Sequence, residues 1–194
     1  MAVKPETRYA RSGDVSIAYQ VVGDEDGPLD LVFVHGFVGH LEVEAENPRV
    51  EAFFERLSSV GRVIRFDRRG TGLSDRLREV PALESRMDDL RAVMDAAKSG
   101  RAVLVATFEA SSIAVVFGAT YPERVAGLVL YNPVAKGIRS PDHQWARFRS
   151  EEELDAGSSR SARAGDSAIS WPRTSANLRR PSPKTRKCRT GGQE

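Results

Sequence analysis

The sequence has 194 residues, 40% of them hydrophobic, and a net charge of +2, which suits one soluble globular domain. No apolar run approaches the roughly 18 residues needed to cross a bilayer, and a single cysteine, Cys188, excludes a disulfide within the chain. The N-terminal Met-Ala-Val-Lys-Pro-Glu-Thr lacks the apolar segment of a signal peptide, so we expect a cytoplasmic protein with no membrane partner.

The first predicted elements are β-strands. Residues 9–10 and 15–22 flank Ser12-Gly13-Asp14, and this spacing predicts a β-hairpin. Residues 29–34 are almost entirely apolar, which is typical of a central strand. They lead into His35-Gly36-Phe37-Val38-Gly39-His40, where the glycines predict a flexible loop and we expect His40 to be exposed.

A helix and a glycine-rich loop follow. Residues 48–60 carry apolar side chains at helical spacing, with Glu51 outward; the expected inner positions are Val50, Phe53, Phe54 and Leu57. Residues 63–66 predict a short strand. The loop at 67–75 lacks the phosphate-binding pattern G-x-x-x-x-G-K-[S/T], so we expect it to brace the sheet, with Ser74 as a loop hydrogen bonder.

Residues 81–97 predict a second long helix, ended by Ser99-Gly100. Its expected inner positions are Leu83, Met87, Leu90, Val93, Met94 and Ala97. Asp88, Asp89 and Asp95 are assigned to the solvated face, so the pattern does not indicate the paired carboxylates of a glycosidase.

The next stretch combines a strand, a sharp turn and a helix. Residues 102–106 are a short apolar run, and residues 113–120 then show helical periodicity. This is the layout of a nucleophile elbow, in which a G-x-S-x-G segment lifts a serine above the sheet. The turn here reads Ala106-Thr107-Phe108-Glu109-Ala110, and the benzyl group of Phe108 can neither attack a carbonyl nor give up a proton. Residues 125–131 then predict another buried strand.

Residues 8 to about 145 resemble the N-terminal half of an α/β-hydrolase. The landmarks occur in the family's order, namely Val-Phe-Val-His-Gly-Phe at 32–37, Asp-Arg-Arg-Gly-Thr-Gly-Leu-Ser at 67–74, the elbow, and Tyr-Pro-Glu-Arg-Val at 121–125. The resemblance implies a mostly parallel sheet with an N-terminal antiparallel hairpin and helices on both faces. It also implies an oxyanion hole built from the Phe37 and Glu109 N–H groups, with His35, Gly36 and Thr107 in the site loop.

The resemblance implies descent from ester or amide hydrolases, but the residues predict that this chain is catalytically incompetent. Phe108 stands at the nucleophile position, and the segments that supply the family's acid and histidine are missing, so the chain looks like a truncated hydrolase. Ser112, in Ala110-Ser111-Ser112-Ile113-Ala114, is the substitute nucleophile, although it lies one helical turn past the elbow. We expect His35 to pack within its loop, and the general-base role is the alternative for His35 and for His143.

The opening segment, residues 8–24, is similar to hydrolase-like domains that precede adenylate cyclase domains in some bacterial proteins. This resemblance implies an alternative function, that of a non-catalytic ligand-sensing or regulatory module of an adenylate-cyclase-type protein. Thr107 and Glu109 flank Phe108 and could present a hydroxyl and a carboxylate to a small acyl or aromatic ligand. We expect no cofactor and no metal.

Residues 151–194 change character after the partial hydrolase domain of residues 1–150. From residue 155 the chain has nine basic and three acidic side chains, a charge of +6 that leaves −4 for residues 1–154. Only Ile169, Trp171 and Leu178 are large apolar residues there, too few to offset an ordering cost of about 1–2 kcal/mol per residue. We expect a disordered, basic, low-complexity tail.

Two origins of this tail stay open, a natural basic arm and out-of-frame translation of a GC-rich coding region. The tail lacks the aromatic residues interleaved with basic ones in single-strand binders, so we do not expect a nucleic-acid partner. If residues 125–131 form an exposed edge of the sheet, we expect self-association and poor solubility.

Overall fold

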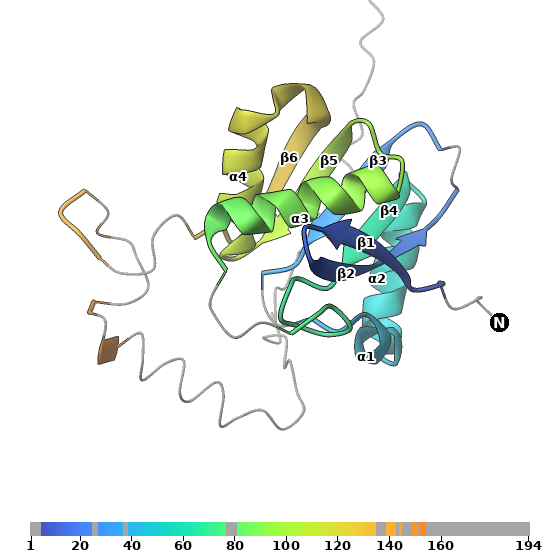
Figure 1. Cartoon of the computed structure of the whole chain (residues 1–194), viewed down its shortest axis with the longest axis horizontal. Coiled ribbons are helices and arrows are strands. Elements are labelled where there is room, and N and C mark those ends of the chain that lie inside the picture. Colours follow the sequence, from blue (N-terminus) through green and yellow to red (C-terminus); the bar gives the residue numbers. More distant parts are fainter. Residues whose placement is uncertain are drawn as a thin grey trace, which may run out of the picture. The chain divides into compact units, whose positions relative to one another are not determined.

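Six strands form one mixed β-sheet flanked by helices (Figure 1). The computed structural model describes residues 5–24, 27–36, 39–76, 81–134, 139–142, 144, 149–150 and 152–153. The strands are β1 (Arg8–Ser12), β2 (Val15–Val22), β3 (Asp30–Val34), β4 (Arg62–Phe66), β5 (Ala102–Thr107) and β6 (Val125–Tyr131). The helices are α1 (Leu41–Ala45), α2 (Pro48–Ser58), α3 (Leu83–Ala96), α4 (Ala110–Thr120) and the 3-10 turn η1 (Pro122–Arg124).

The strand order is β1-β2-β4-β3-β5-β6. Strand β2 pairs antiparallel with β1 and with β4, and the pairs β3–β4, β3–β5 and β5–β6 are parallel. Strands β4 and β3 occupy the middle of the sheet, and their β-branched and apolar residues are buried on both faces. The predicted fold class, a mostly parallel sheet that begins with an antiparallel hairpin, is therefore confirmed.

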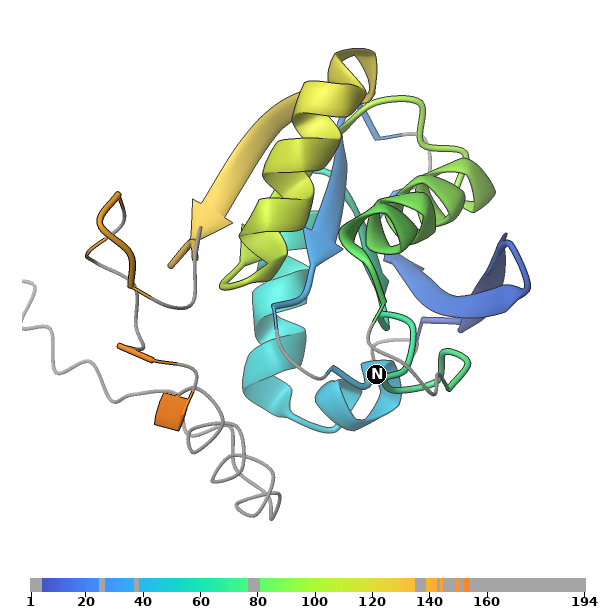
Figure 2. The same ribbon diagram turned by 60° about the vertical axis from the view of Figure 1, so that its left-hand side comes forward.

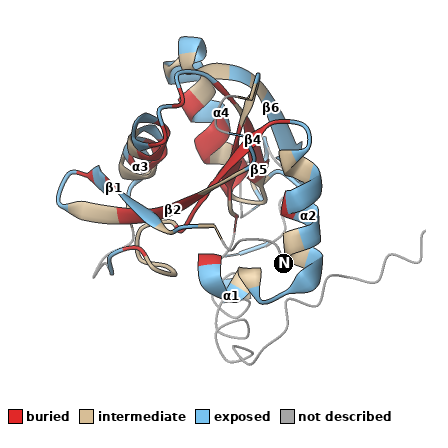
Figure 3. Ribbon diagram, turned by 90° about the vertical axis from the view of Figure 1, so that its right-hand side faces the viewer, coloured by how far each residue is buried: buried red, intermediate tan, exposed pale blue. Residues whose placement is uncertain are grey.

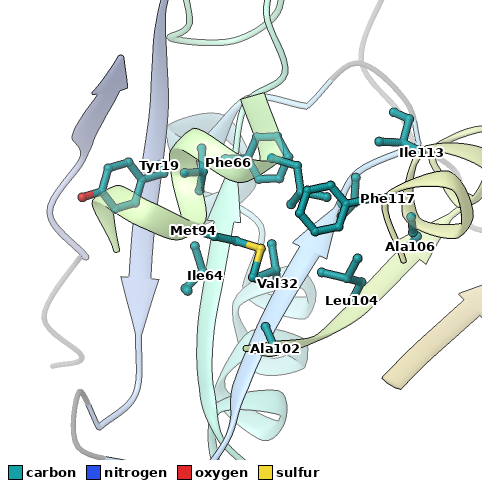
Figure 4. Close-up of a cluster of buried hydrophobic side chains, with 14 of the residues drawn as sticks. Tyr19, Val32, Ile64, Phe66, Met94, Ala102, Leu104, Ala106, Ile113 and Phe117 are labelled. Atoms are coloured by element: carbon teal, nitrogen blue, oxygen red, sulfur yellow. The ribbon is translucent and has the colours of Figure 1, made fainter. Parts of the chain in front are cut away.

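Helices cover both faces of the sheet (Figure 2). On one face α3 and α4 pack on the larger core, in which Met94 and Phe117 meet Val32, Ile64 and Leu104 of the strands (Figure 4). On the other face α2 inserts Phe54 into a smaller core. Among the described residues, no helix combines the length and the apolar character that crossing a bilayer requires.

Helix α2 differs from its predicted orientation at two positions. Phe53 was expected to point inward, but 48% of it is exposed. Glu51 was expected to point outward, but its Oε1 lies 2.9 Å from Nη1 of Arg65, a β4 residue that is only 2% exposed. The buried guanidinium also lies over the Phe54 ring, 4.7 Å from its centroid. The helix therefore turns so that Glu51 neutralises a cation inside the sheet, which leaves Phe53 at the rim.

Asp89 does not lie on the solvated face of α3, as the sequence predicted. It is 2% exposed, and its two carboxylate oxygens accept hydrogen bonds of 2.6 and 2.5 Å from Nε and Nη2 of Arg69. This hydrogen bonding raises the pKa of Arg69. Asp88 and Asp95 are exposed as predicted.

The termini of two helices also depart from the prediction. Helix α3 ends through Lys98, which takes the left-handed conformation at φ 56°, while the Ser99 N–H bonds to the Met94 carbonyl at 2.8 Å. The last helical residue is Ala96, one residue before the predicted end of the helix at Ala97. Helix α1 was not predicted, and His40, expected to be an exposed loop residue, is half-buried and forms its N-cap.

Strand β6 was predicted to be buried, but in the described structure it is the exposed edge strand of the sheet (Figure 3). Leu128, Val129, Leu130 and Tyr131 are between 36% and 57% exposed. The prediction was wrong because an apolar run indicates a strand, whereas the burial of that strand depends on what lies beyond it.

Three predicted features lie outside the described residues: Phe37, His143 and nearly all of the tail at residues 151–194. The tail's disorder and the boundary at residue 150 therefore stay predictions.

The buried Arg69–Asp89 pair provides a test of this packing. We expect Asp89→Ala to lower the free energy of unfolding by about 3 kcal/mol, because it leaves a partly buried guanidinium without its anion. The neighbouring Asp88→Ala removes an exposed pair with Arg91 and should cost less than about 1 kcal/mol. Urea unfolding of both variants measures the difference, and equal losses would contradict the buried assignment.

Candidate functional site

A sharp bend joins β5 to α4 at the position where the sequence predicts an elbow. Strand β5 ends at Thr107 and α4 begins at Ala110, so the direction of the chain changes within two residues. Phe108 at the bend has φ 50°, a left-handed conformation that is uncommon for a residue with a large side chain. Such a conformation persists only where the surrounding structure holds it.

Backbone hydrogen bonds hold this bend against the end of β6. The Phe108 N–H donates to the Tyr131 carbonyl at 3.0 Å. The Phe108 carbonyl accepts from the N–H groups of Ser111 at 3.1 Å and Val134 at 3.3 Å. Both backbone polar groups of the strained residue are thus paired, which offsets part of the cost of its φ angle.

The loop after β3 touches the bend at Gly36. The Gly36 N–H donates to Thr107 Oγ1 at 2.9 Å, and a Cβ at position 36 would lie 2.1 Å from the Thr107 carbonyl oxygen and 2.9 Å from Phe108 Cβ. No side chain fits there without displacing the backbone. The structure therefore brings together three of the predicted site residues, Gly36, Thr107 and Phe108.

The Phe108 side chain is half-buried and packs edge-to-face on Tyr131, with ring centroids 6.1 Å apart at an interplanar angle of 88°. Tyr131 itself is 57% exposed. The side chain at the bend thus offers an aromatic surface, and it supplies no oxygen or sulfur atom for attack on a carbonyl carbon.

Glu109, the other flanking residue, forms an ion pair with Arg68. Arg68 Nη1 lies 3.1 Å from Glu109 Oε1, and the Arg68 side chain is 16% exposed. Burial lowers the pKa of Arg68, and the charge of Glu109 acts in the opposite direction. Sequence reasoning did not single out Arg68, because it occupies the variable second position of the Asp67-Arg68-Arg69-Gly70 segment.

The loop at 67–75 has the structural role predicted for it, since it is hydrogen-bonded to strand β2 and to the start of α1. The carboxylate of Asp67 is buried and accepts from the Leu41 N–H at 3.1 Å and the Leu73 N–H at 2.8 Å. Burial raises the pKa of Asp67, although these two hydrogen bonds act to lower it. Ser74 Oγ donates to the Asp67 carbonyl at 2.6 Å and accepts from the Ala18 N–H at 2.9 Å, which confirms it as a loop hydrogen bonder.

Ser112, the predicted substitute nucleophile, and its neighbour Ser111 lie inside α4, past the bend. Ser111 is 2% exposed. Ser112 Oγ donates a 2.7 Å hydrogen bond to the Glu109 carbonyl in the first turn of the helix. Neither serine occupies the bend, where Phe108 stands.

His35 contacts α1 and the neighbouring aromatic residues. Its Nε2 lies 3.0 Å from Glu44 Oε1, and its ring packs edge-to-face on Phe33 at 5.5 Å. These are contacts of the kind that a loop-packing role requires. Phe37, whose N–H is the other predicted oxyanion donor beside Glu109, lies outside the described residues.

The described residues contain no group of three or more His, Cys, Asp or Glu side chains placed to hold a metal ion. A polar depression of about 630 Å³ lies away from the elbow, where the β1–β2 turn meets α3. Its charged lining residues are Arg11, Asp14, Arg69, Asp88, Arg91 and Asp95, three of each sign.

Comparison with known proteins identifies this architecture. Residues 31–185 match the profile of the alpha/beta hydrolase fold family. No curated protein matches the sequence significantly.

Solved structures with the same fold include several hydrolases. The 2-hydroxy-6-oxo-6-phenylhexa-2,4-dienoate hydrolase of Rhodococcus sp. strain RHA1 is 19% identical, with a TM-score of 0.59 over 72% of this chain and 50% of that one. Cfl2 from Burkholderia cenocepacia is 22% identical, with a TM-score of 0.59 over 80% and 56% of the two chains. Est816, which degrades N-acyl homoserine lactones, is 26% identical, with a TM-score of 0.55 over 66% and 46%. This chain thus spans about half the length of these proteins.

The close approach at Gly36 leads to a stability prediction. We expect Gly36→Ala to lower the free energy of unfolding by about 2 kcal/mol or more, because the new methyl group must displace the backbone of β5. Gly100→Ala adds the same methyl group where no atom lies within 4 Å, and should change the stability by less than about 0.5 kcal/mol. Urea unfolding compares the two, and similar stabilities would contradict the contact between Gly36 and the bend.

Proposed function

This chain belongs to the alpha/beta hydrolase fold family, and we propose that its elbow binds a small acyl or aromatic ligand without hydrolysing it. One observation carries the proposal, namely that Phe108 occupies the bend between β5 and α4 with the left-handed φ of 50° that places a side chain on top of such a turn. The scaffold that normally presents a nucleophile is in place, and an aromatic ring stands where the nucleophile belongs.

The chemistry of the bend argues against acyl transfer. Nucleophilic catalysis on this fold needs an oxygen or sulfur atom at the bend with a base beside it. Ser112 lies one helical turn further on, and its hydroxyl donates to the Glu109 carbonyl. His35, one of the candidate bases, lies against Glu44 of α1. A serine hydrolase without its triad loses about 10⁶-fold in turnover.

The surroundings of the bend indicate the class of ligand. Phe108 and Tyr131 present two half-exposed aromatic rings at right angles, which suits an aromatic or acyl group packing against them. The Glu109 side chain beside them is 41% exposed and paired with Arg68, so polar contacts are within reach of the same surface. Two structural relatives act on aromatic or acyl substrates: one is a hydrolase of a phenylhexadienoate, and the other degrades N-acyl homoserine lactones.

Binding without turnover also suits the alternative that the sequence raised, a ligand-sensing or regulatory module of an adenylate-cyclase-type protein. That alternative depends on the resemblance of residues 8–24, which form the β1–β2 hairpin at the opposite edge of the sheet from β6. In this alternative, binding of the ligand at the elbow regulates the activity of a separate cyclase domain.

Turnover and binding are measured on the same preparation. We expect no hydrolysis of 4-nitrophenyl butyrate above the buffer rate and no covalent adduct with a fluorophosphonate. We expect saturable binding of 4-phenylbutyrate by calorimetry, weakened about tenfold in Phe108→Ala, because part of the aromatic surface is lost.

Phe53→Ala is the matched control, since it removes a half-exposed ring on α2 and should leave the affinity for 4-phenylbutyrate unchanged. Turnover with an adduct on any side chain of the wild-type chain would contradict the loss of catalysis. The absence of saturable binding, or an equal effect of the two alanine variants, would contradict the ligand site at the elbow.

A further inference from the structure

Strand β6 forms one edge of the sheet, and among the described strands it pairs only with β5 (Figure 1). Along an edge strand, every second residue directs its N–H and C=O groups away from the sheet. These outward groups form a ready template for another strand. The edge is therefore a candidate interaction surface, independent of the elbow's chemistry.

The side chains of β6 and of the neighbouring helix α4 are uncharged, although Arg101 contacts the start of β6 through the Val125 carbonyl. Neither β6 nor α4 contains an Asp, Glu, Lys or Arg, whereas 29% of the whole sequence is charged. Their exposed large residues on the α4 face of the sheet define what we call the α4–β6 surface: Val115, Val116, Leu128 and Leu130. Val129 and Tyr131 alternate with them and point to the opposite face of the sheet. A strand edge normally carries charges that discourage pairing, and β6 has none.

The two parts of the α4–β6 surface are neighbours. Helix α4 packs beside β6, and the Gly118 position faces Leu128, since a Cβ there would lie 3.8 Å from Leu128 Cδ1. Val115 precedes Gly118 by one helical turn and so points to the same side of α4. Figure 3 shows β6 mainly in the colours of exposed and half-buried residues.

The opposite edge of the sheet is protected. Strand β1 carries Arg8 and Arg11, both exposed, and these charges discourage the approach of another strand. Pairing of β6 of one copy with β1 of the next would build an open filament of many copies. The charges of these two arginines oppose that pairing. Only the β6 edge is both unpaired and uncharged among the described strands.

We propose that β6 pairs with β6 of a second copy of this chain, antiparallel about a two-fold axis, with the α4–β6 surfaces packed against each other. A second copy fits because an uncharged strand meets its own image without repulsion, and because the two-fold arrangement closes both edges at once. A bound peptide would instead leave a new open edge. The result is one continuous sheet that ends at β1 on both sides.

The oligomeric state of the full chain tests this arrangement. Size-exclusion chromatography with light scattering should give twice the 21.3 kDa mass of one chain at micromolar concentration. Val129→Lys places like charges on both sides of the two-fold axis and should weaken the dimer by at least about 100-fold, leaving a monomer. Val60→Lys is the matched control, because Val60 is 62% exposed and lies outside the α4–β6 surface; this variant should stay dimeric.

Charge complementation separates loss of the interface from loss of folding. Val129→Glu alone should also be monomeric, and an equimolar mixture with Val129→Lys should recover the dimer as a mixed pair. A monomeric wild type, a dimer that survives Val129→Lys, an open series of higher oligomers, or no recovery on mixing two folded variants would each overturn the proposal.

Discussion

The structure depends on a contact between two backbones, where Gly36 lies against Thr107 and Phe108. A Cβ at position 36 would fall 2.1 Å from the Thr107 carbonyl oxygen, so the loop after β3 can pass over the end of β5 only with glycine there. The Gly36 N–H then bonds to the Thr107 hydroxyl, and the start of that loop is fixed relative to the bend. The geometry of the candidate site is therefore set by two neighbouring parallel strands of the sheet.

The bend keeps its geometry without a nucleophile. Its left-handed φ at Phe108 costs about 1–3 kcal/mol in a non-glycine residue. That cost is offset in part by two hydrogen bonds that attach the bend to the end of β6: the Phe108 N–H donates to the Tyr131 carbonyl, and the Phe108 carbonyl accepts from the Val134 N–H. The conformation of the turn is thus set by the sheet and the neighbouring loops, so the turn forms even though the residue at the bend is a phenylalanine.

Sequence reasoning found most of the fold because the signals for it are local. The apolar runs of β3 and β5 and the hairpin of β1 and β2 can be read within windows of a few residues. The elbow was located because a strand signal changes abruptly to a helix signal around Phe108. The features that it missed depend on partners far along the chain: Asp89 is buried because Arg69 faces it, and Glu51 turns inward because Arg65 is buried in β4.

The exposure of β6 and the pairing of Glu109 with Arg68 could not be predicted for the same reason. An apolar strand has the same sequence at an edge as in the middle of a sheet, and an ion pair between two loops leaves no periodic pattern. Helix α1 was missed because its five residues are too short for helical periodicity to show.

The strand order also constrains how the chain acquires its structure. Strand β3 lies between β4 and β5, and its pairing with β5 joins Asp30 to Ala102. During synthesis the first half of the chain can form only the hairpin and the β2–β4–β3 part of the sheet, with one side of β3 open. Closing such a distant pair is slow, because the loop entropy is lost before the contacts form. Until β5 has been synthesised, the side of β3 that pairs with residues 102–106 therefore stays open, and such exposed apolar edges favour association.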